Sequence, residues 1–352
     1  MEIDELYFEK IIDKGEHSDV YLAYEKENNN IKYAAKRYDR SLIEGPEIFK
    51  SLLHHEIKIF QNFNHQNILK LFNLKKTKEN FYTILEYCNG GNLSTILDNY
   101  QLRYGQPFSQ EIVQHLMRQL ISGLKNIFEK KLVHGDIKLK SILIHFDTEK
   151  DKEELNMMKA TIKISRFKSS LKPQKILNQE LMKVDDKLLD DIKKGKPQDI
   201  FDLGLVCFKM IFGNYGHDSV DYEQLINDIQ EGKKNYPFTL SKEILLFLKN
   251  MLAKNLDQRL KIKKLSKHIF LTKDIKDFEL INGQNNDQNE KNGEHLCIYC
   301  LARTCEIIIS PCGHKCICNF CYYGFLKGKD NFKLCPICRK PIISVVEKVF
   351  EV

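Results

Sequence analysis

Four pairs of closely spaced cysteine and histidine residues lie in the last sixth of the chain, and they constrain its fold more than any other feature. The pairs are Cys297 and Cys300, Cys312 and His314, Cys318 and Cys321, and Cys335 and Cys338. A tetrahedral Zn²⁺ site takes four thiolate or imidazole ligands, and a closely spaced pair supplies two of them from one turn. Eight such ligands therefore predict a small fold held together by two zinc ions.

The order and spacing of these pairs resemble those of the RING finger. The residues around the ligands, Pro311-Cys312-Gly313-His314 and Cys335-Pro336-Ile337-Cys338-Arg339, are similar to the C-terminal RING of the inhibitor-of-apoptosis class over residues 297–350. In that family the first and third pairs hold one ion, and the second and fourth pairs hold the other. The resemblance implies one site formed by Cys297, Cys300, Cys318 and Cys321, and a second formed by Cys312, His314, Cys335 and Cys338.

Two further cysteines in this segment, Cys305 and Cys316, are left over. We expect them to be buried thiols or surface bystanders, although Cys316 is an alternative ligand to Cys318 and the sequence leaves that register open. A zinc-stapled domain can also serve only as a scaffold. Zinc binding by itself therefore does not establish an activity.

The distribution of cysteines and charge indicates the compartment and the partners. Nine of the eleven cysteines lie between 297 and 338, which is unlike a disulfide scaffold. The chain shows no apolar N-terminal segment behind a basic start and no run of about eighteen apolar residues, so we expect a cytoplasmic or nuclear protein without a membrane partner. Seven coordinating thiolates and two Zn²⁺ lower the formal charge of +7 to about +4, which does not favour nucleic-acid binding.

A polar segment marks the domain boundary. Residues 281–295 contain one apolar residue among many asparagines, glutamines and glycines, so they cannot bury enough surface to fold. We accordingly predict a first domain at 1–272, a flexible linker at 273–294 and the zinc-binding domain at 295–352.

The first domain alternates strand-like and helical patterns. Short β-rich runs at 19–24, 31–36 and 81–87 precede helical patterns at 109–130 and 199–212. This order resembles a protein kinase domain, a small β lobe followed by a helical lobe, over residues 5–271. The resemblance implies an α+β, bilobal kinase-like fold that is followed by the small two-zinc RING domain.

Several residues match kinase landmarks individually. Tyr33-Ala34-Ala35-Lys36 occupies the place of the strand motif whose lysine holds nucleotide phosphates, and Glu56 matches the helix glutamate that pairs with that lysine. The segment 85–93 matches the hinge that hydrogen-bonds adenine. The catalytic loop keeps Asp136 at the position of the base, with Lys138 close by. Later landmarks are the helix segment 199–204, Arg259, His268 and Phe270.

Other kinase positions have lost the residue types that the chemistry requires. Phosphoryl transfer depends on Mg²⁺ ions and on their oxygen ligands. Ser141 stands where the family holds its second metal with asparagine, and the metal-binding Asp-Phe-Gly triplet aligns with Arg166-Phe167-Lys168. Arg166 and Lys168 thus place two cations where a carboxylate is needed, and a guanidinium repels a divalent ion.

The phosphate-covering loop has changed as well. Aligned on Val20, its glycine pattern keeps only Gly15. Three acidic residues add negative charge near the expected phosphates, namely Asp13, Glu16 and Asp19. Gly135 replaces the arginine that a phosphorylated activation loop would engage. These departures predict a pseudokinase, in which Arg166 still allows ATP to bind without Mg²⁺.

Some of these landmarks also have a purely structural interpretation. Lys36 and Glu56 can persist as an ion pair that holds a helix against the sheet, and we favour this slightly over nucleotide binding. For Asp136 we favour a loop residue retained by folding over a catalytic base. The charged insert at 147–155 is predicted to be a solvated loop.

The two resemblances together imply a RING-type ubiquitin ligase whose kinase-like domain recognises an unidentified protein substrate. A RING binds a ubiquitin-conjugating enzyme and holds its thioester-linked ubiquitin in a reactive pose, which is catalysis by orientation. By resemblance, Ile298 and Pro336 form the apolar platform for that enzyme, and Arg339 bridges the enzyme and ubiquitin. The alternative for Ile298 is packing within the zinc loop.

The chain ends in an apolar, strand-like segment. In the inhibitor-of-apoptosis class such a tail builds a RING dimer, which implies a homodimer contact through Val346, Val349 and Phe350. The alternative is a terminal strand that closes its own domain. Two other functions stay open: a divergent active Ser/Thr kinase with a RING docking module, which Lys36 and Asp136 support, and a non-catalytic scaffold.

Overall fold

The computed structural model describes residues 2–15, 18–40, 57–58, 60–61, 63–104, 106–167, 186–213, 221–231, 240–278, 280–281, 305–319, 322–323, 335 and 341–347. The described residues fall into two compact units, the first within 1–93 and 116–202 and the second within 94–115 and 203–352.

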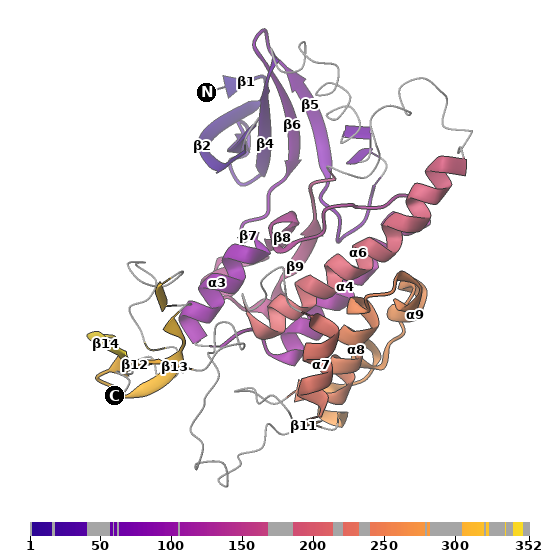
Figure 1. The fold of residues 1–352 in the computed structure, drawn as a ribbon. Coiled ribbons are helices and arrows are strands. Elements are labelled where there is room, and N and C mark those ends of the chain that lie inside the picture. The colour runs from indigo at the N-terminus through magenta and orange to yellow at the C-terminus, as the bar shows by residue number, and fades with distance from the viewer. Residues whose placement is uncertain are drawn as a thin grey trace. The chain divides into compact units, whose positions relative to one another are not determined.

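The first unit begins with a six-stranded antiparallel sheet of order β1-β2-β3-β4-β6-β5, drawn in indigo to purple in Figure 1. Its strands are β1 (Glu2–Ile3), β2 (Leu6–Lys14), β3 (Asp19–Glu25), β4 (Lys32–Asp39), β5 (Leu71–Lys76) and β6 (Asn80–Glu86). On its buried face Phe8 packs edge-to-face on Tyr82, with ring centroids 5.4 Å apart, beside the fully buried Ala23 and Ala35. Strands β3, β4 and β6 overlap the three predicted β-rich runs, which are confirmed.

A second, three-stranded sheet of order β7-β8-β9 follows in the same unit. It contains β7 (Gly91–Asn92), β8 (Ile142–His145) and β9 (Thr161–Ile164), and burial alternates along β8 and β9. Beside it, Asn89 forms a reciprocal pair with the backbone of Phe146: its Nδ2 donates to the carbonyl at 2.8 Å and its Oδ1 accepts from the N–H at 2.8 Å. This pair holds the hinge segment against the end of β8.

The charged insert at 147–155 is a short helix rather than the predicted loop. Helix α5 (Glu149–Glu153) is followed by the 3₁₀ turn η2 (Met157–Lys159). The Thr148 hydroxyl caps α5 by accepting the N–H of Asp151 at 3.0 Å, and Lys152 pairs with Glu149 one turn away. No residue of α5 is buried, so the predicted exposure is right, but local capping makes the segment helical.

Helices make up most of the remaining kinase-like segment. They are α3 (Leu93–Tyr104), α4 (Gln110–Glu129), α6 (Asp186–Phe212), α7 (Tyr222–Gln230), α8 (Lys242–Leu252), α9 (Ile262–Leu265) and α10 (Ile269–Thr272), with 3₁₀ turns η1 (Leu139–Ser141), η3 (Leu256–Gln258) and η4 (Ile275–Asp277). Helix α4 confirms the predicted helix at 109–130, whereas α6 begins well before residue 199 and contains Pro197 in its interior. Within the described ranges, no helix is both long and apolar enough to cross a membrane.

The core of the second unit contains the predicted closing residues. The rings of Phe247 and Phe270 are 5.1 Å apart, His268 caps α10 by accepting the Phe270 N–H, and the Arg259 Nε donates to the Ala253 carbonyl at 2.8 Å. Strand β10 (Leu240–Ser241) pairs with β11 (Leu280–Ile281). Described secondary structure, η4 and β11, therefore continues past residue 272, where the linker was predicted to begin.

The C-terminal domain contains a three-stranded antiparallel sheet of order β13-β12-β14. Its strands, drawn in yellow in Figure 1, are β12 (Ile307–Ser310), β13 (His314–Ile317) and β14 (Ser344–Glu347). Ile307, Ile309 and Ile317 are fully buried in its small core together with Cys318 and Cys335. All seven of the described buried core residues are cysteine or isoleucine, and six of them lie in or directly beside the β12–β13 hairpin, as expected for a domain that relies on metal.

Candidate metal centre and kinase-like site

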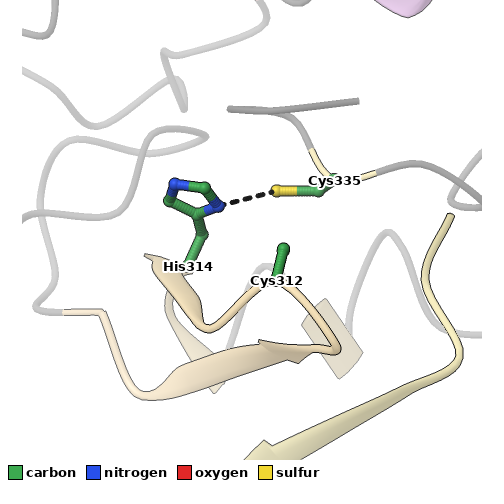
Figure 2. Close-up of side chains that lie close together, drawn as sticks. All are labelled: Cys312, His314 and Cys335. Carbon is green, nitrogen blue, oxygen red and sulfur yellow. Dashed lines mark hydrogen bonds between the residues drawn. The ribbon is translucent and has the colours of Figure 1, made fainter. Parts of the chain in front are cut away.

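Three of the predicted zinc ligands lie together in the C-terminal domain (Figure 2). Cys312 lies in the turn between β12 and β13, His314 is the first residue of β13, and Cys335 comes from a later part of the chain. One ligand atom from each residue lies within 4.8 Å of the other two. The Sγ atom of Cys335 is 3.7 Å from Nδ1 of His314.

This arrangement fits a tetrahedral Zn²⁺ ion. Zinc bonds of about 2.3 Å to sulfur and about 2.0 Å to nitrogen place two such ligand atoms about 3.5 Å apart, close to the separation of Cys335 and His314. Gly313 makes the tight turn, with φ of 74° and its N–H donating to the Ile309 carbonyl at 2.7 Å. All three ligands belong to the second site implied by the RING resemblance, and its fourth ligand, Cys338, lies outside the described residues.

The other zinc site stays a prediction. Cys318 is fully buried directly after β13, whereas Cys297, Cys300 and Cys321 lie outside the described residues. Cys305 and Cys316 are buried in the core of the same domain, in line with the expectation of buried thiols. Because Cys316 and Cys318 are equally buried, burial does not decide which of them is the ligand.

The predicted dimer tail pairs with its own domain. Strand β14 aligns Val345 with Ile309 and Val346 with Ile308, which matches the alternative of a terminal strand. Val346 is nevertheless 52% exposed and Ile343 79% exposed, so this edge keeps an apolar surface. The remaining predicted contact residues lie outside the described part of the chain: Val349, Phe350, Ile298, Pro336 and Arg339.

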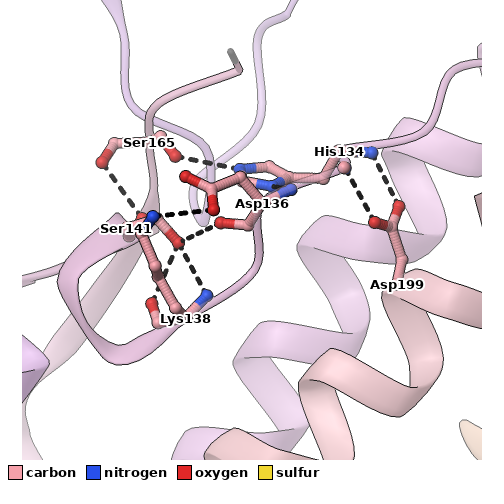
Figure 3. A network of polar contacts seen from close by, with 7 residues as sticks. His134, Asp136, Lys138, Ser141, Ser165 and Asp199 are labelled. Atoms are coloured by element: carbon pink, nitrogen blue, oxygen red, sulfur yellow. Dashed lines mark hydrogen bonds and ion pairs between the residues drawn. The ribbon is translucent and has the colours of Figure 1, made fainter. Parts of the chain in front are cut away.

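In the kinase-like part, the loop at 134–141 is anchored by Asp199 of α6 (Figure 3). One Asp199 oxygen accepts the N–H of His134 at 2.6 Å and the other accepts that of Gly135 at 2.8 Å. Burial raises the pKa of Asp199, and these two N–H donors oppose that rise. Gly135 has φ of 76°, which glycine adopts without a steric cost.

His134 is a fully buried, neutral histidine. Its Nε2 donates to the Ser165 carbonyl at 2.9 Å, and its Nδ1 accepts the N–H of Asp136 at 3.2 Å, which assigns the proton to Nε2. Burial lowers the pKa of His134 to about 4. The ring thus joins the loop at 134–141 to the segment after β9 without carrying charge.

Phe167 extends this connection through aromatic packing. It is almost fully buried, and its ring centroid is 4.9 Å from that of His134, 5.2 Å from Phe60 and 5.6 Å from Phe63. In the sequence alone, Phe167 stands out only as the middle residue of an altered triplet. Its role as an aromatic anchor could have been expected from the hydrophobic residue kept between two cations.

Asp136 and Ser141 are both engaged within their own loop. The Asp136 carboxylate pairs with the Lys138 Nζ at 2.7 Å, and both side chains are partly exposed. The buried Ser141 hydroxyl accepts the Lys138 N–H at 2.9 Å and lies 2.9 Å from the carbonyls of Asp136 and Lys138. Ser141 therefore serves the backbone of the loop, while Asp136 is accessible.

Arg166 forms an ion pair with the altered phosphate loop. Its Nη2 is 2.9 Å from the Asp13 carboxylate, and Asp19 pairs with Arg37 at 2.5 Å. Both described carboxylates that we expected near the phosphates therefore have an arginine partner, and their effect on phosphate binding stays a prediction. Glu16 lies outside the described residues.

The other kinase landmarks lie on the first sheet. The N–H of Gly15 donates to the Ser18 carbonyl at 2.7 Å, and Val20 aligns with Lys36 between β3 and β4, two residues along from Ala34. The Lys36 ammonium lies 4.9 Å from the centre of the Tyr38 ring. Glu56 and Lys168 lie outside the described residues, so the ion pair of Lys36 with Glu56 stays a prediction.

Comparisons with known proteins match both parts of the chain. The protein kinase domain family model matches residues 7–271, and the model of the C3HC4-type zinc finger (RING finger) matches 293–345. The chain is 26% identical over 268 residues to serine/threonine-protein kinase ATG1a of Arabidopsis thaliana and 24% identical over 267 residues to serine/threonine-protein kinase PLK2 of Mus musculus. It is 25% identical over 281 residues to an Aurora kinase of Yarrowia lipolytica.

These alignments cover 74%, 74% and 77% of this chain. They span 40% of the Arabidopsis relative, 36% of the mouse relative and 69% of the yeast relative. The kinase match covers well over half of the chain and coincides with the described sheets and helices. The protein therefore belongs to the protein kinase domain family, and it carries a C-terminal RING-type zinc finger.

Proposed function

We propose that this protein is a RING-type ubiquitin ligase whose kinase-like domain has lost phosphoryl transfer and recognises a substrate or partner. The observation that carries the proposal is the ligand cluster of Cys312, His314 and Cys335 within a segment that matches the RING model. Bound zinc would supply structural support by holding the C-terminal domain in one conformation. Surface residues of the chain would then bind the substrate or partner.

In this proposal the RING acts by orientation. Ile298 and Pro336 contact the ubiquitin-conjugating enzyme, and Arg339 donates to both that enzyme and its ubiquitin, which a planar guanidinium does better than an ammonium. Restricting the thioester to a reactive pose accelerates transfer without a nucleophile in the ligase. The sequence around the ligands further supports an inhibitor-of-apoptosis-like RING that dimerises through its tail in the cytoplasm or nucleus.

The loss of kinase activity is supported by the metal positions. Arg166 places a guanidinium where a carboxylate would bind Mg²⁺, and it is already paired with Asp13. Ser141 directs its hydroxyl to the loop backbone. Nucleotide binding in this domain would therefore be insensitive to Mg²⁺ or weakened by it, because the ion and Arg166 repel each other.

The test of the ligase is autoubiquitination in vitro across a panel of conjugating enzymes. We expect Ile298→Ala and Arg339→Ala each to abolish transfer while zinc content stays at the wild-type value, because neither residue is a ligand. Only Ile298→Ala should weaken the binding of an uncharged conjugating enzyme. Wild-type activity in both variants would contradict these roles, and absence of any conjugating-enzyme binding would leave the RING as a scaffold.

A second candidate function is a divergent active Ser/Thr kinase. Its support is the accessible Asp136, the intact anchoring of the loop by Asp199, and the names of the relatives, which are serine/threonine kinases. Radiolabelled phosphate transfer by wild type beside Asp136→Ala separates the two proposals. We expect no magnesium-dependent transfer by either protein, and transfer lost specifically in Asp136→Ala would overturn the pseudokinase proposal.

A further inference from the structure

The ion pair of Asp13 and Arg166 joins two segments that are 153 residues apart in the sequence. Asp13 lies near the end of β2, just before the turn into β3, and Arg166 lies two residues after β9. The Arg166 Nη2 is 2.9 Å from the Asp13 Oδ2, and the side chains are 41% and 53% exposed. The pair is therefore a solvent-accessible bridge between the β2–β3 hairpin and the segment after β9.

Arg166 is presented from a rigid backbone. Its φ of 66° lies in the left-handed region, which costs a residue such as arginine free energy that asparagine or aspartate largely avoids. Both neighbours are fixed: the Ser165 N–H donates to the Ser141 carbonyl at 2.8 Å, and Phe167 is buried in its aromatic cluster. Strain of this kind persists only where the surroundings impose it, and such positions concentrate at functional sites.

Asp13 is also held in place by its surroundings. It aligns with Val20 across the hairpin, and the bond from the Gly15 N–H to the Ser18 carbonyl closes the turn. The other described acidic residue of this hairpin end, Asp19, is paired with Arg37 of β4. Each described acidic residue at this end of the hairpin thus pairs with one arginine. Arg37 belongs to the same sheet as Asp19, whereas Arg166 lies outside the sheet that contains Asp13.

We propose that Asp13 and Arg166 form an intramolecular clasp that takes the place of a metal-bound polyphosphate. In an active kinase the ligand would connect the phosphate loop to the metal-binding triplet, whereas here a direct ion pair connects the same two positions. A polyphosphate that enters this site competes with Asp13 for the Arg166 guanidinium. This inference rests on the proposed loss of phosphoryl transfer, and it identifies the ion pair of Asp13 and Arg166 as the contact that replaces the bound ligand.

The expected effect is modest. An exposed ion pair shifts an equilibrium by up to about five-fold, and salt weakens it further. Removing Asp13 should therefore raise the equilibrium constant for local opening of the hairpin by no more than about five-fold. It should raise the affinity for a metal-free polyphosphate by a similar factor. Removing Arg166 should loosen the hairpin equally but provide no gain in affinity, since the guanidinium is then absent.

Hydrogen exchange of the full-length protein at low salt tests the clasp. We compare wild type with Asp13→Asn, Arg166→Gln and the double variant, and follow the amides of residues 11–14 and 19–22. Each single change should raise exchange there by about two- to five-fold, and the double change should add nothing, because the pair is already broken. Unchanged exchange in the single variants, or additive increases in the double variant, would overturn the clasp.

A matched control is Lys26→Gln, which removes an ion pair with Glu2 of similar exposure in the same sheet. It should leave exchange at 11–14 and 19–22 unchanged. In parallel, ATP binding is measured with EDTA: Asp13→Asn should bind more tightly than wild type, and equal or absent binding would overturn the competition. These results are distinct from a failure of the pseudokinase proposal. That proposal fails only if the protein transfers phosphate and Asp136→Ala abolishes the transfer.

Discussion

Burial of His134 predicts a loss of stability on acidification that can be worked out from the structure. The pKa of His134 is lowered to about 4 from its ordinary value of 6.5, because the ring is fully buried. The unfolded chain binds a proton below pH 6.5, whereas the folded domain keeps the ring neutral. The contribution of the neutral His134 ring to the free energy of unfolding is therefore complete above about pH 6.5 and is lost as the pH falls towards 4.

The magnitude follows from the width of this window. One proton taken up only by the unfolded chain costs about 1.4 kcal/mol per pH unit, so about 2.5 units correspond to about 3 kcal/mol. The hydrogen bonds of the His134 ring also disfavour its protonation in the folded state. Protonation of Nδ1 would place an N–H against the N–H of Asp136, which now donates to that nitrogen at 3.2 Å.

The assay is urea unfolding of the full chain at several pH values between about 7.5 and 4.5, followed by the helical circular dichroism signal. The variant His134→Phe keeps an aromatic ring beside Phe167 but cannot titrate. We expect it to be less stable than wild type by about 2–4 kcal/mol at neutral pH, because the Ser165 carbonyl and the Asp136 N–H lose their partner. This deficit should shrink by about 3 kcal/mol on acidification, and a deficit independent of pH would refute the reasoning.

Three further predictions concern the zinc domain and the hinge. Wild-type protein should contain about two Zn²⁺ per chain and Cys335→Ser about one, and elemental analysis that finds equal zinc in both would contradict the ligand cluster. Val346→Lys should shift the full-length protein from dimer to monomer in light scattering, because it places a charge on the exposed edge of β14, and a wild type that is already monomeric would leave β14 as a terminal strand only. Gly90→Ala should destabilise the kinase-like domain by about 1–3 kcal/mol in thermal or urea unfolding, since an added Cβ would lie 2.8 Å from the Ile144 carbonyl oxygen and 3.0 Å from the Phe146 ring, and wild-type stability would contradict this close packing.

Much of the fold was predictable because its signals are local. The β-rich runs that form β3, β4 and β6 and the helical pattern that forms α4 are properties of short stretches of sequence, and the close spacing of Cys312 and His314 is also a local signal. Resemblance then supplied the long-range pairing with Cys335, which the structure brings to the same place.

The parts that were missed depend on contacts that no local pattern encodes. The ion pair of Asp13 with Arg166 joins β2 to the segment after β9, so the sequence indicated two unfavourable charges where the structure has one neutral pair. Similarly, η4 and β11 extend the first domain because Phe278 is buried and β11 pairs with β10, although the surrounding composition resembles a linker. In each case tertiary contact overrides what composition suggests.

The kinase-like site separates residues that folding requires from residues that chemistry requires. His134, Asp199 and Phe167 are buried, and each holds the loop or the segment after β9 through hydrogen bonds or ring contacts. Replacing any of them would leave an unsatisfied group or a cavity, at a cost of about 1–5 kcal/mol. Arg166 is partly exposed, so no core packing at that position requires a metal-binding carboxylate. Selection for fold alone would therefore preserve the first group and permit loss of the second, which agrees with the proposed loss of phosphoryl transfer.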